Sequence, residues 1–463
     1  MKKLWGGRFK KEMHPVLKCF SYSLAVDHEL LEAELRVNAA WARMLARIRL
    51  ITPREAAKLV RGLKSIAKDF GIPGGGKPFD LASFRNYEDV HTLIQSLLEK
   101  KAGAVAKKIH TARSRNDLVV TSTRIYLRDK LQFLDGKIKL TQKALVLCAE
   151  KAGGLIIPGM THLRKAQPVL LAHHLLAYVE MLEEDRLRFL DAGKRVNILP
   201  LGSGALAGSG LPIDQKFLAK ELGFAKIAAN SLAAVADRGF MTEVLSGLAI
   251  LWMHLSRLSE DFILWNSEPF HYLELDDAFA TGSSLMPHKK NPDVFELIRG
   301  RSAVIFGHLQ ALLTLQKGLP LAYNRDLQED KPALFDALRK TGSALEVLRL
   351  TVDSVSFNRD AIQTALDDEG LFATDVLEYL VKKKVPFSEA HEIVGRLVRQ
   401  SLEISKPVRE FSIKELKSFS PVFGPDLYDL LNPESSVRAK KTLGSTNPAF
   451  VKKEIKRWKL SLK

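Results

Sequence analysis

Residues 244–265 read VLSGLAILWMHLSRLSEDFILW, and this stretch decides the fold class. Its apolar side chains return at alternating steps of four and three residues, which places them on one side of a helix. The series is Val244, Leu248, Leu251, Leu255, Leu258, Phe262 and Trp265. A stripe of this length needs cover from other helices, so the stretch predicts one long member of a helical bundle.

The same spacing recurs further along the chain. A second seam comprises Leu334, Leu338, Thr341, Leu345, Leu348, Val352 and Val355. Long helical stretches are also predicted at 117–150, 168–195 and 293–317, whereas no series of short alternating runs is separated by hairpin turns. We therefore expect an all-α protein with a long central helical bundle and smaller N- and C-terminal helical domains.

Loops rich in Gly, Pro, Ser and Asn interrupt these helices. They lie at 71–78, 153–168, 197–212, 280–292 and 318–328. Rigid helices leave such loops free to carry chemistry. From about residue 360 the helical pieces become shorter and are broken by prolines. We expect an N-terminal domain at 1–112, a central bundle domain at 113–362 and a small C-terminal domain at 363–463.

Composition and charge limit the function classes. The 463 residues carry a formal charge of +17, which would suit phosphate binding if it were concentrated on one face. The Lys and Arg residues are instead spread along the chain, and the basic tail 452–463 has a single aromatic residue rather than the interleaved set of a stacking platform. A basic surface that attracts small anions is therefore expected, rather than a nucleic-acid site.

No feature directs the chain to a membrane or to secretion. The basic start Met1–Lys11 is not followed by an apolar segment, and no uninterrupted apolar run reaches the ~18 residues of a membrane span. The two cysteines, Cys19 and Cys148, are too few for a disulfide framework. We expect a cytoplasmic protein with no membrane partner.

The segment Gly282-Ser283-Ser284-Leu285-Met286-Pro287-His288-Lys289-Lys290-Asn291-Pro292 has the strongest chemical character. Its Gly-Ser-Ser turn offers hydroxyl and backbone N–H groups, and two lysines follow closely. Such a loop could hold a carboxylate or lower the pKa of a hydroxyl. Taken alone, it could equally be a basic loop before a helix.

Two further segments also place polar side chains where they could take part in catalysis or binding. Thr161 and His162 are expected in a loop between helices, where an imidazole could serve as acid or base. Ser114, Arg115 and Asn116 lie at a helix start, where they could bracket carboxylates. The alternatives are a solvent-facing histidine and a helix-capping loop.

Together these segments make the chain similar to a known family. Gly282–Pro292 resembles the signature loop of the fumarase/aspartase superfamily. The combination of Leu4–Phe9, His110–Asp117, Thr161–Pro168 and Lys317–Lys331 resembles the argininosuccinate lyase family in particular. The resemblance extends over essentially the whole chain, into the small domain around Pro386–His391.

The resemblance implies a homotetramer whose long helices form a twenty-helix bundle, with active sites shared between subunits. The implied reaction is the reversible β-elimination of argininosuccinate to arginine and fumarate, a step of arginine biosynthesis, without a metal or other cofactor. Ser283 would be the base on carbon, Lys289 would stabilise developing charge, and His162 would be the acid at nitrogen, supported by Glu296. The opposite allocation of acid and base stays open.

The resemblance also implies a set of substrate-binding residues. Asp89 and His91 match a polar family motif near the site, where a capping role and a catalytic role are both open. The substrate-binding residues implied are Ser23, Ser114, Arg115, Asn116, Thr161, Asn291, Tyr323, Gln328 and Lys331.

The chain departs from the family pattern at several positions. Ala112 stands where Gly is usual, Asn38 belongs to a Val-Asn pair that replaces Gly-Ser, and Ala233 and Gly239 replace acids. His288, usually Gln, is similar to adenylosuccinate lyase, so that sister lyase is the enzymatic alternative. A structural role like that of a lens crystallin and nucleic-acid binding are the alternatives from other classes.

Overall fold

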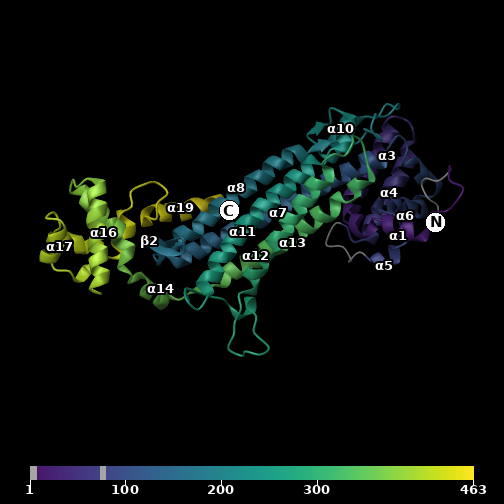
Figure 1. Ribbon diagram of the computed structural model, residues 1–463. Coiled ribbons are helices and arrows are strands. Elements are labelled where there is room, and N and C mark those ends of the chain that lie inside the picture. Colours follow the sequence, from purple (N-terminus) through teal and green to yellow (C-terminus); the bar gives the residue numbers. More distant parts are fainter. Residues whose placement is uncertain (1–7, 73–79, 463) are drawn as a thin grey trace. The chain divides into compact units, whose positions relative to one another are not determined.

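The structure is a computed structural model that describes residues 8–72 and 80–462 (Figure 1). Helices dominate it, which confirms the all-α prediction, and six short strands form three two-stranded sheets within the described residues. In chain order the helices and strands are α1 (Pro15–Ser21), α2 (Leu24–Asp27), α3 (Leu31–Arg47), α4 (Pro53–Asp69), α5 (Leu81–Phe84), α6 (Val90–Ala102), α7 (Arg115–Ala152), β1 (Ile156–Thr161), β2 (Arg164–Leu170), α8 (Leu171–Val196), β3 (Ile198–Leu199), α9 (Gln215–Leu222), β4 (Lys226–Ile227), α10 (Ser231–Ala236), α11 (Gly239–Asn266), β5 (Leu273–Glu274), α12 (Asp293–Gln316), α13 (Asp330–Ser354), β6 (Ser356–Phe357), α14 (Arg359–Leu366), α15 (Ala373–Lys382), α16 (Phe387–Glu403), α17 (Ile413–Phe419), α18 (Pro433–Ala439) and α19 (Pro448–Ser461).

The long helices form where the apolar spacing predicts them. The stretches 117–150, 168–195 and 293–317 correspond to α7, α8 and α12. The first seam lies on α11, and the second lies on α13 except for Val355, just beyond its end. Val244, Leu248, Leu251 and Leu255 of the first seam are fully buried. Helix α11 is long and apolar enough to cross a membrane by length and composition alone, but 56% of its most apolar window is buried, as in a core helix.

The chain divides into two compact units. The first comprises Met1–Asp135, Arg186–Ile250 and Val304–Thr341, and the second comprises Gly136–Asp185, Leu251–Ala303 and Gly342–Lys463. Each of the five long helices α7, α8, α11, α12 and α13 contributes a segment to both units. The expected three-domain division at 112 and 362 stays a prediction.

In the first unit, α3, α4 and α6 pack against one another around buried apolar side chains. Helix α4 begins with a capping box, in which Thr52 and Glu55 bond each other's backbone N–H groups. Gly62 lets α4 approach α6 closely, because a Cβ there would lie 2.8 Å from Leu98 Cδ1. Trp41 of α3 is fully buried, and its indole N–H donates to Thr111 O at 3.3 Å.

The second unit contains a β-hairpin where the sequence predicts only a loop at 153–168. Strands β1 and β2 pair antiparallel, with Ile156 opposite Leu170 and Ile157 opposite Val169. The prediction of a loop was wrong because this stretch lacks the usual sequence signals of a β-hairpin. Two prolines lie opposite each other, the register shifts at Gly159/Met160, and the turn contains neither Gly nor Asn.

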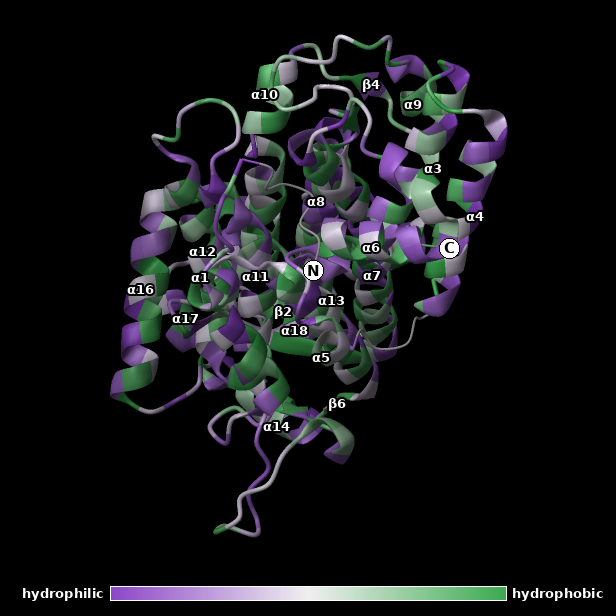
Figure 2. Cartoon of the chain, turned by 90° about the vertical axis from the view of Figure 1, so that its right-hand side faces the viewer, coloured by the Kyte–Doolittle hydropathy of each residue, from purple (hydrophilic) through white to green (hydrophobic). Residues whose placement is uncertain are grey.

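The C-terminal part of the second unit has its own hydrophobic cluster. Its centre includes Leu380 of α15, Ala390 and Leu397 of α16, and Leu416 of α17. Hydrophobic and hydrophilic residues alternate along α16, as expected of a helix with one buried side (Figure 2).

Candidate functional site

Polar side chains from distant parts of the sequence line a cavity of about 170 Å³ in the first unit. Six of the nine predicted substrate-binding residues are among them: Ser23, Arg115, Asn116, Tyr323, Gln328 and Lys331. Asp89 and His91 also line the cavity, with Asp27, Glu88, Val119 and Arg325, which the sequence interpretation missed. Glu88 and Arg325 lie inside the quoted motifs, so the motif positions could have indicated them.

Arg115, at the start of α7, is held by groups around α6. Its guanidinium lies 3.1 Å from Asp89 Oδ2 and donates to Thr92 Oγ1 at 2.8 Å. Asp89 is the N-cap of α6 and accepts from Thr92 N at 2.7 Å, so the capping role is present. Burial favours a higher pKa for Asp89, but nearby His91 and Arg115 outweigh it and lower the pKa.

The other side of the cavity comes from the start of α2 and the segment before α13. Ser23 Oγ donates to Asp27 Oδ2 at 2.6 Å, and the Gln328 side chain donates to Ser21 O at 3.2 Å. Lys331 is buried and donates to Asp330 Oδ1 at 2.6 Å. Burial raises the pKa of Tyr323, which keeps its hydroxyl protonated as a donor.

A buried ion pair adjoins the cavity. His91 Nδ1 is 2.5 Å from Glu34 Oε2, and both side chains are almost inaccessible to water. Burial would lower the pKa of His91, but the carboxylates of Glu34, Asp89 and Asp27 raise it. These carboxylates therefore favour the protonated form of His91. Burial raises the pKa of Asp27 to about 6.

Asp117 ties the start of α7 to the loop at 197–212. Its carboxylate accepts from Ser114 N, Gly202 N and Gly204 N, each at 3.0 Å. Ser114 does not line the cavity; its hydroxyl accepts from Asn116 N at 3.1 Å. Asn116 in turn donates to Ala205 O at 3.1 Å. The predicted carboxylate-binding segment is thus fixed by backbone contacts.

His162 and Thr161 lie at the tip of the hairpin in the second unit. His162 and Leu163 are the two central residues of the turn, with φ of +55° and +56°. Positive φ at both positions is typical of a type I′ turn, which normally uses Gly or Asn. The hairpin borders a cavity of about 410 Å³, lined also by His174, Asp261 and Trp265.

Ser283, Lys289 and Asn291 belong to a loop that extends from the helices of the second unit, before α12 (Figure 1). Backbone bonds between Thr281 and Asn291 close its base. Ser283 Oγ accepts from Leu285 N at 3.3 Å and Met286 N at 3.1 Å. Such donors stabilise an alkoxide more than a neutral hydroxyl. Lys289 is exposed at the end of the loop.

The predicted pairing of His162 with Glu296 is not made within the described residues of one chain. Glu296 is exposed in the first turn of α12, and His162 is exposed at the hairpin tip. No ion pair joins them in the parts of the chain that the structure describes. The pairing therefore stays a prediction that needs a second subunit.

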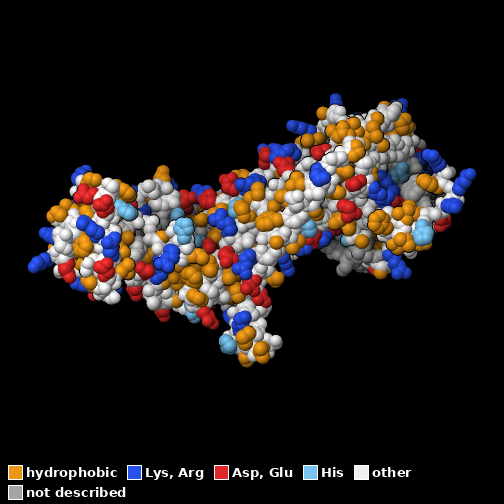
Figure 3. Space-filling model, viewed as in Figure 1, with side chains coloured by type: hydrophobic (Ala, Val, Ile, Leu, Met, Phe, Trp, Pro, Cys, Tyr) orange, Lys and Arg blue, Asp and Glu red, His pale blue; other side chains and the backbone are white. Residues whose placement is uncertain are grey.

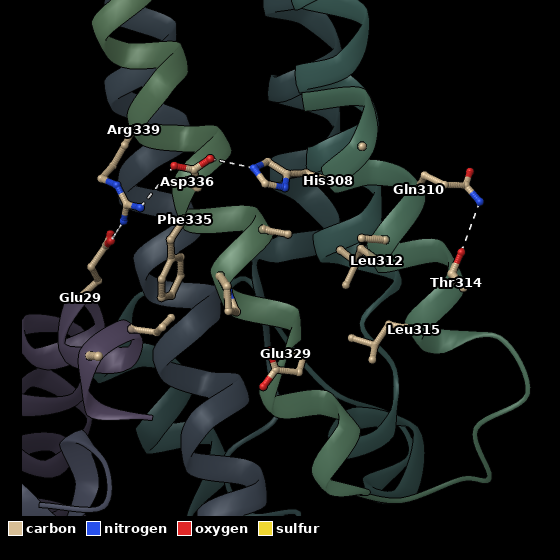
Figure 4. A pocket seen from close by; sticks show the side chains of 16 residues that line it. Glu29, His308, Gln310, Leu312, Thr314, Leu315, Glu329, Phe335, Asp336 and Arg339 are labelled. Atoms are coloured by element: carbon tan, nitrogen blue, oxygen red, sulfur yellow. Dashed lines mark hydrogen bonds and ion pairs between the residues drawn. The ribbon is translucent and has the colours of Figure 1, made fainter. Parts of the chain in front are cut away.

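A more voluminous cavity carries none of the predicted site residues. This groove in the first unit has about 1010 Å³ and lies between segments of α12 and α13 (Figure 4). Its lining is mainly apolar, with His308 paired to Asp336 at 2.7 Å along one edge. Cavity volume alone therefore does not identify the functional site. Among residues 8–72 and 80–462, no three His, Cys, Asp or Glu side chains are grouped to hold a metal ion.

Comparisons with known proteins show the family of this chain. The family model described as lyase matches residues 7–307, and the model of the argininosuccinate lyase C-terminal region matches 370–438. The chain is 46% identical to argininosuccinate lyase of Desulforudis audaxviator, over 99% of this chain and 98% of the relative. It is 44% identical to that of Pelotomaculum thermopropionicum, over the same shares of both chains.

The chain belongs to the argininosuccinate lyase family. It is therefore a lyase, as the motifs predict. Among solved structures, EDDS lyase in complex with formate matches with a TM-score of 0.83 and 26% identity, covering 98% of this chain and 91% of that one. The predicted helical-bundle fold is that of the fumarase/aspartase superfamily, to which these solved structures belong.

Two departures from the family pattern have visible structural consequences. Ala112, where the family usually has Gly, adopts φ +63°, a left-handed conformation that favours glycine. Asn38 accepts a hydrogen bond from the Arg113 guanidinium at 2.8 Å and donates to Glu34 O. The family motif at Leu4–Phe9 lies mostly outside the described residues. Nothing in the structure explains His288 or Ala233.

Proposed function

We propose that this chain catalyses the reversible elimination of fumarate from argininosuccinate, releasing arginine. The observation that carries the proposal is the cavity in which six predicted substrate-binding residues meet, in a chain of this family. Its donors, among them Arg115, Gln328 and Lys331, suit carboxylates, while Asp27, Glu88 and Asp89 suit a cationic group. Argininosuccinate carries both kinds of charge.

The reaction breaks a C–N bond after a proton leaves the carbon beside a carboxylate. Ser283 takes that proton as an alkoxide, which its two backbone donors and Lys289 favour. The electron pair then forms the double bond of fumarate as the nitrogen departs. His162 supplies the proton to that nitrogen, and Glu296 supports its positive charge. No metal or other cofactor takes part in this proposal.

A homotetramer with shared sites is part of the proposal. The groups with assigned roles lie on a loop, a hairpin and a cavity, so contacts between subunits would bring them together. Exposed apolar side chains on α12 support such contacts: Leu297, Val304, Phe306 and Leu313 are 41–53% exposed. We place the protein in the cytoplasm, which cell fractionation can test.

The decisive experiment is a fumarate-release assay on the purified protein with argininosuccinate and, in parallel, adenylosuccinate. We expect fumarate only from argininosuccinate. Release from adenylosuccinate alone would assign the sister activity, and no release from either would favour a structural role. Nucleic-acid binding has little support, because Lys and Arg are interspersed with acids on the face shown in Figure 3.

A further inference from the structure

Asp27 is a buried acid at the substrate cavity to which the family resemblance gives no role. It lies at the end of α2 and is 3% exposed. Glu88 and Asp89, the other acids of the cavity, lie near Arg115, whereas no Lys or Arg of the described residues lies within ion-pair distance of Asp27. Burying a carboxylate is costly, so its hydrogen bonds must offset part of that cost, together with the charge of nearby His91.

The two carboxylate oxygens of Asp27 accept from two different parts of the chain. Oδ1 accepts from Val90 N at 3.0 Å, at the start of α6, and Oδ2 accepts from Ser23 Oγ at 2.6 Å. The same segment before α6 also holds the Ser23 backbone, because Ser23 N donates to Glu88 O at 2.8 Å. Val90 is fully buried. Asp27 therefore connects the Ser23 hydroxyl to a helix that is fixed by packing.

The bond to Asp27 decides how Ser23 faces the cavity. A serine hydroxyl has one proton and two lone pairs, whereas an ionised carboxylate can only accept. The 2.6 Å bond commits the Ser23 proton to Asp27 and so fixes the directions in which the hydroxyl presents its lone pairs. Ser23 is partly exposed and Asp27 is almost inaccessible, so a ligand meets the hydroxyl rather than the carboxylate.

We infer that Asp27 is a positioning residue, which acts on the substrate through the orientation of the Ser23 hydroxyl. The inference rests on the proposed function, in which Ser23 binds argininosuccinate. A group that is oriented before the substrate arrives loses little freedom on binding, which favours affinity. The nearest alternative is that Asp27 contacts the substrate itself.

The test is a double-mutant cycle on the purified full-length protein, with KM and kcat measured by fumarate release from argininosuccinate. Asp27→Asn can keep the bond to Val90 N through its amide oxygen, but its amide nitrogen donates to Ser23 Oγ. The hydroxyl is then released to present its proton elsewhere. We expect Asp27→Asn and Ser23→Ala each to raise KM about three- to tenfold, as for the loss of one hydrogen bond, with kcat within about twofold of the parent.

The double variant separates positioning from direct contact. If Asp27 acts through Ser23, Ser23→Ala combined with Asp27→Asn should have the KM of Ser23→Ala alone, within about twofold, because no hydroxyl remains to be oriented. A KM that rises by the product of the two single effects would mean that Asp27 contacts the substrate, and it would overturn the inference. A parental KM in either single variant would overturn it as well.

Asp375→Asn is the matched control. Asp375 is also buried and accepts from a serine hydroxyl, Ser436 Oγ, at 2.6 Å, but it belongs to the second unit and does not line the cavity. We expect parental KM and kcat in this variant. A KM raised as much as in Asp27→Asn would assign the effect to the loss of any buried acid and would contradict the inference.

Circular dichroism verifies that each variant is folded. If Asp27→Asn does not fold, Asp27→Thr replaces it with the same expected KM values, because its hydroxyl lies one bond nearer the backbone and leaves Ser23 without its acceptor. A parent that releases no fumarate would contradict the proposed function, and the inference would fall with it. An active parent with independent effects of Asp27 and Ser23 would contradict the inference alone.

Discussion

At the scale of single residues, His162 combines a strained backbone conformation with the predicted role of an acid. A left-handed conformation costs roughly 1 to 2 kcal/mol per non-glycine residue, and both His162 and Leu163 adopt it. Strain of this kind persists where the surrounding structure fixes it, often at functional sites. The turn presents the imidazole at the tip of the hairpin.

His162→Asn should keep the turn, because Asn tolerates positive φ, while removing the acid. We expect turnover to fall at least ~100-fold with substrate affinity retained. Steady-state kinetics and calorimetry measure the two quantities. Leu163→Gly is the control, because it relieves strain without removing the imidazole; its turnover should stay within a few-fold of the parent. Equal losses in both variants would assign the effect to the turn.

Ala112→Gly should stabilise the protein. Ala112 has φ +63°, where a Cβ is unfavourable, although glycine adds entropy to the unfolded chain. We expect a net gain of up to about 1 kcal/mol in the free energy of unfolding, measured with urea. Ala233→Gly, within helix α10, should instead destabilise by up to about 1 kcal/mol. A loss at both positions would contradict the argument.

At the scale of elements, Asp117 joins the first turn of α7 to the loop at 197–212. An amide cannot accept from all three N–H groups, so Asp117→Asn should leave buried donors unpaired. We expect a loss of about 2 to 4 kcal/mol in the free energy of unfolding. Asp129→Asn, which breaks an exposed pair with Arg36, should cost less than about 1 kcal/mol.

The pH dependence of Asp117 has a definite sign. Burial raises its pKa from 3.8 to about 6, so its native form holds the proton more tightly than the unfolded chain does. The stabilisation that comes from proton binding to Asp117 is fully present below about pH 4 and is lost as pH rises through about 6, whereas the hydrogen bonds to its carboxylate do not depend on that proton. Urea unfolding of the parent and Asp117→Asn across this range should show a steeper decline in the parent.

At the scale of the whole molecule, the proposed shared sites predict complementation between inactive variants. His162→Asn and Ser283→Ala chains, mixed and refolded together, should regenerate some sites free of either change. Each variant refolded alone serves as the control and should stay inactive. Mixed tetramers, verified by mass, that have no activity would show that each site comes from one chain.

The amino-acid sequence by itself determined the helical class and the family. Helical spacing is local, so the seams at 244–265 and 334–355 predicted α11 and most of α13; Val355 lies just beyond the end of α13. Motifs such as Gly282–Pro292 are contiguous, and they carried the resemblance that the comparisons confirm. Both kinds of signal need only neighbouring residues.

Only the tertiary structure decided which of the polar residues meet. Ser23, Arg115 and Tyr323 line one cavity although they are far apart in sequence, and no local pattern placed Asp27 beside them. The buried pair of Glu34 and His91 depends on packing between α3 and α6. The hairpin that carries His162 also depends on pairing that its turn residues do not signal. Burial and long-range contacts fix these features, because the free energy of a charge depends on what surrounds it in the folded chain.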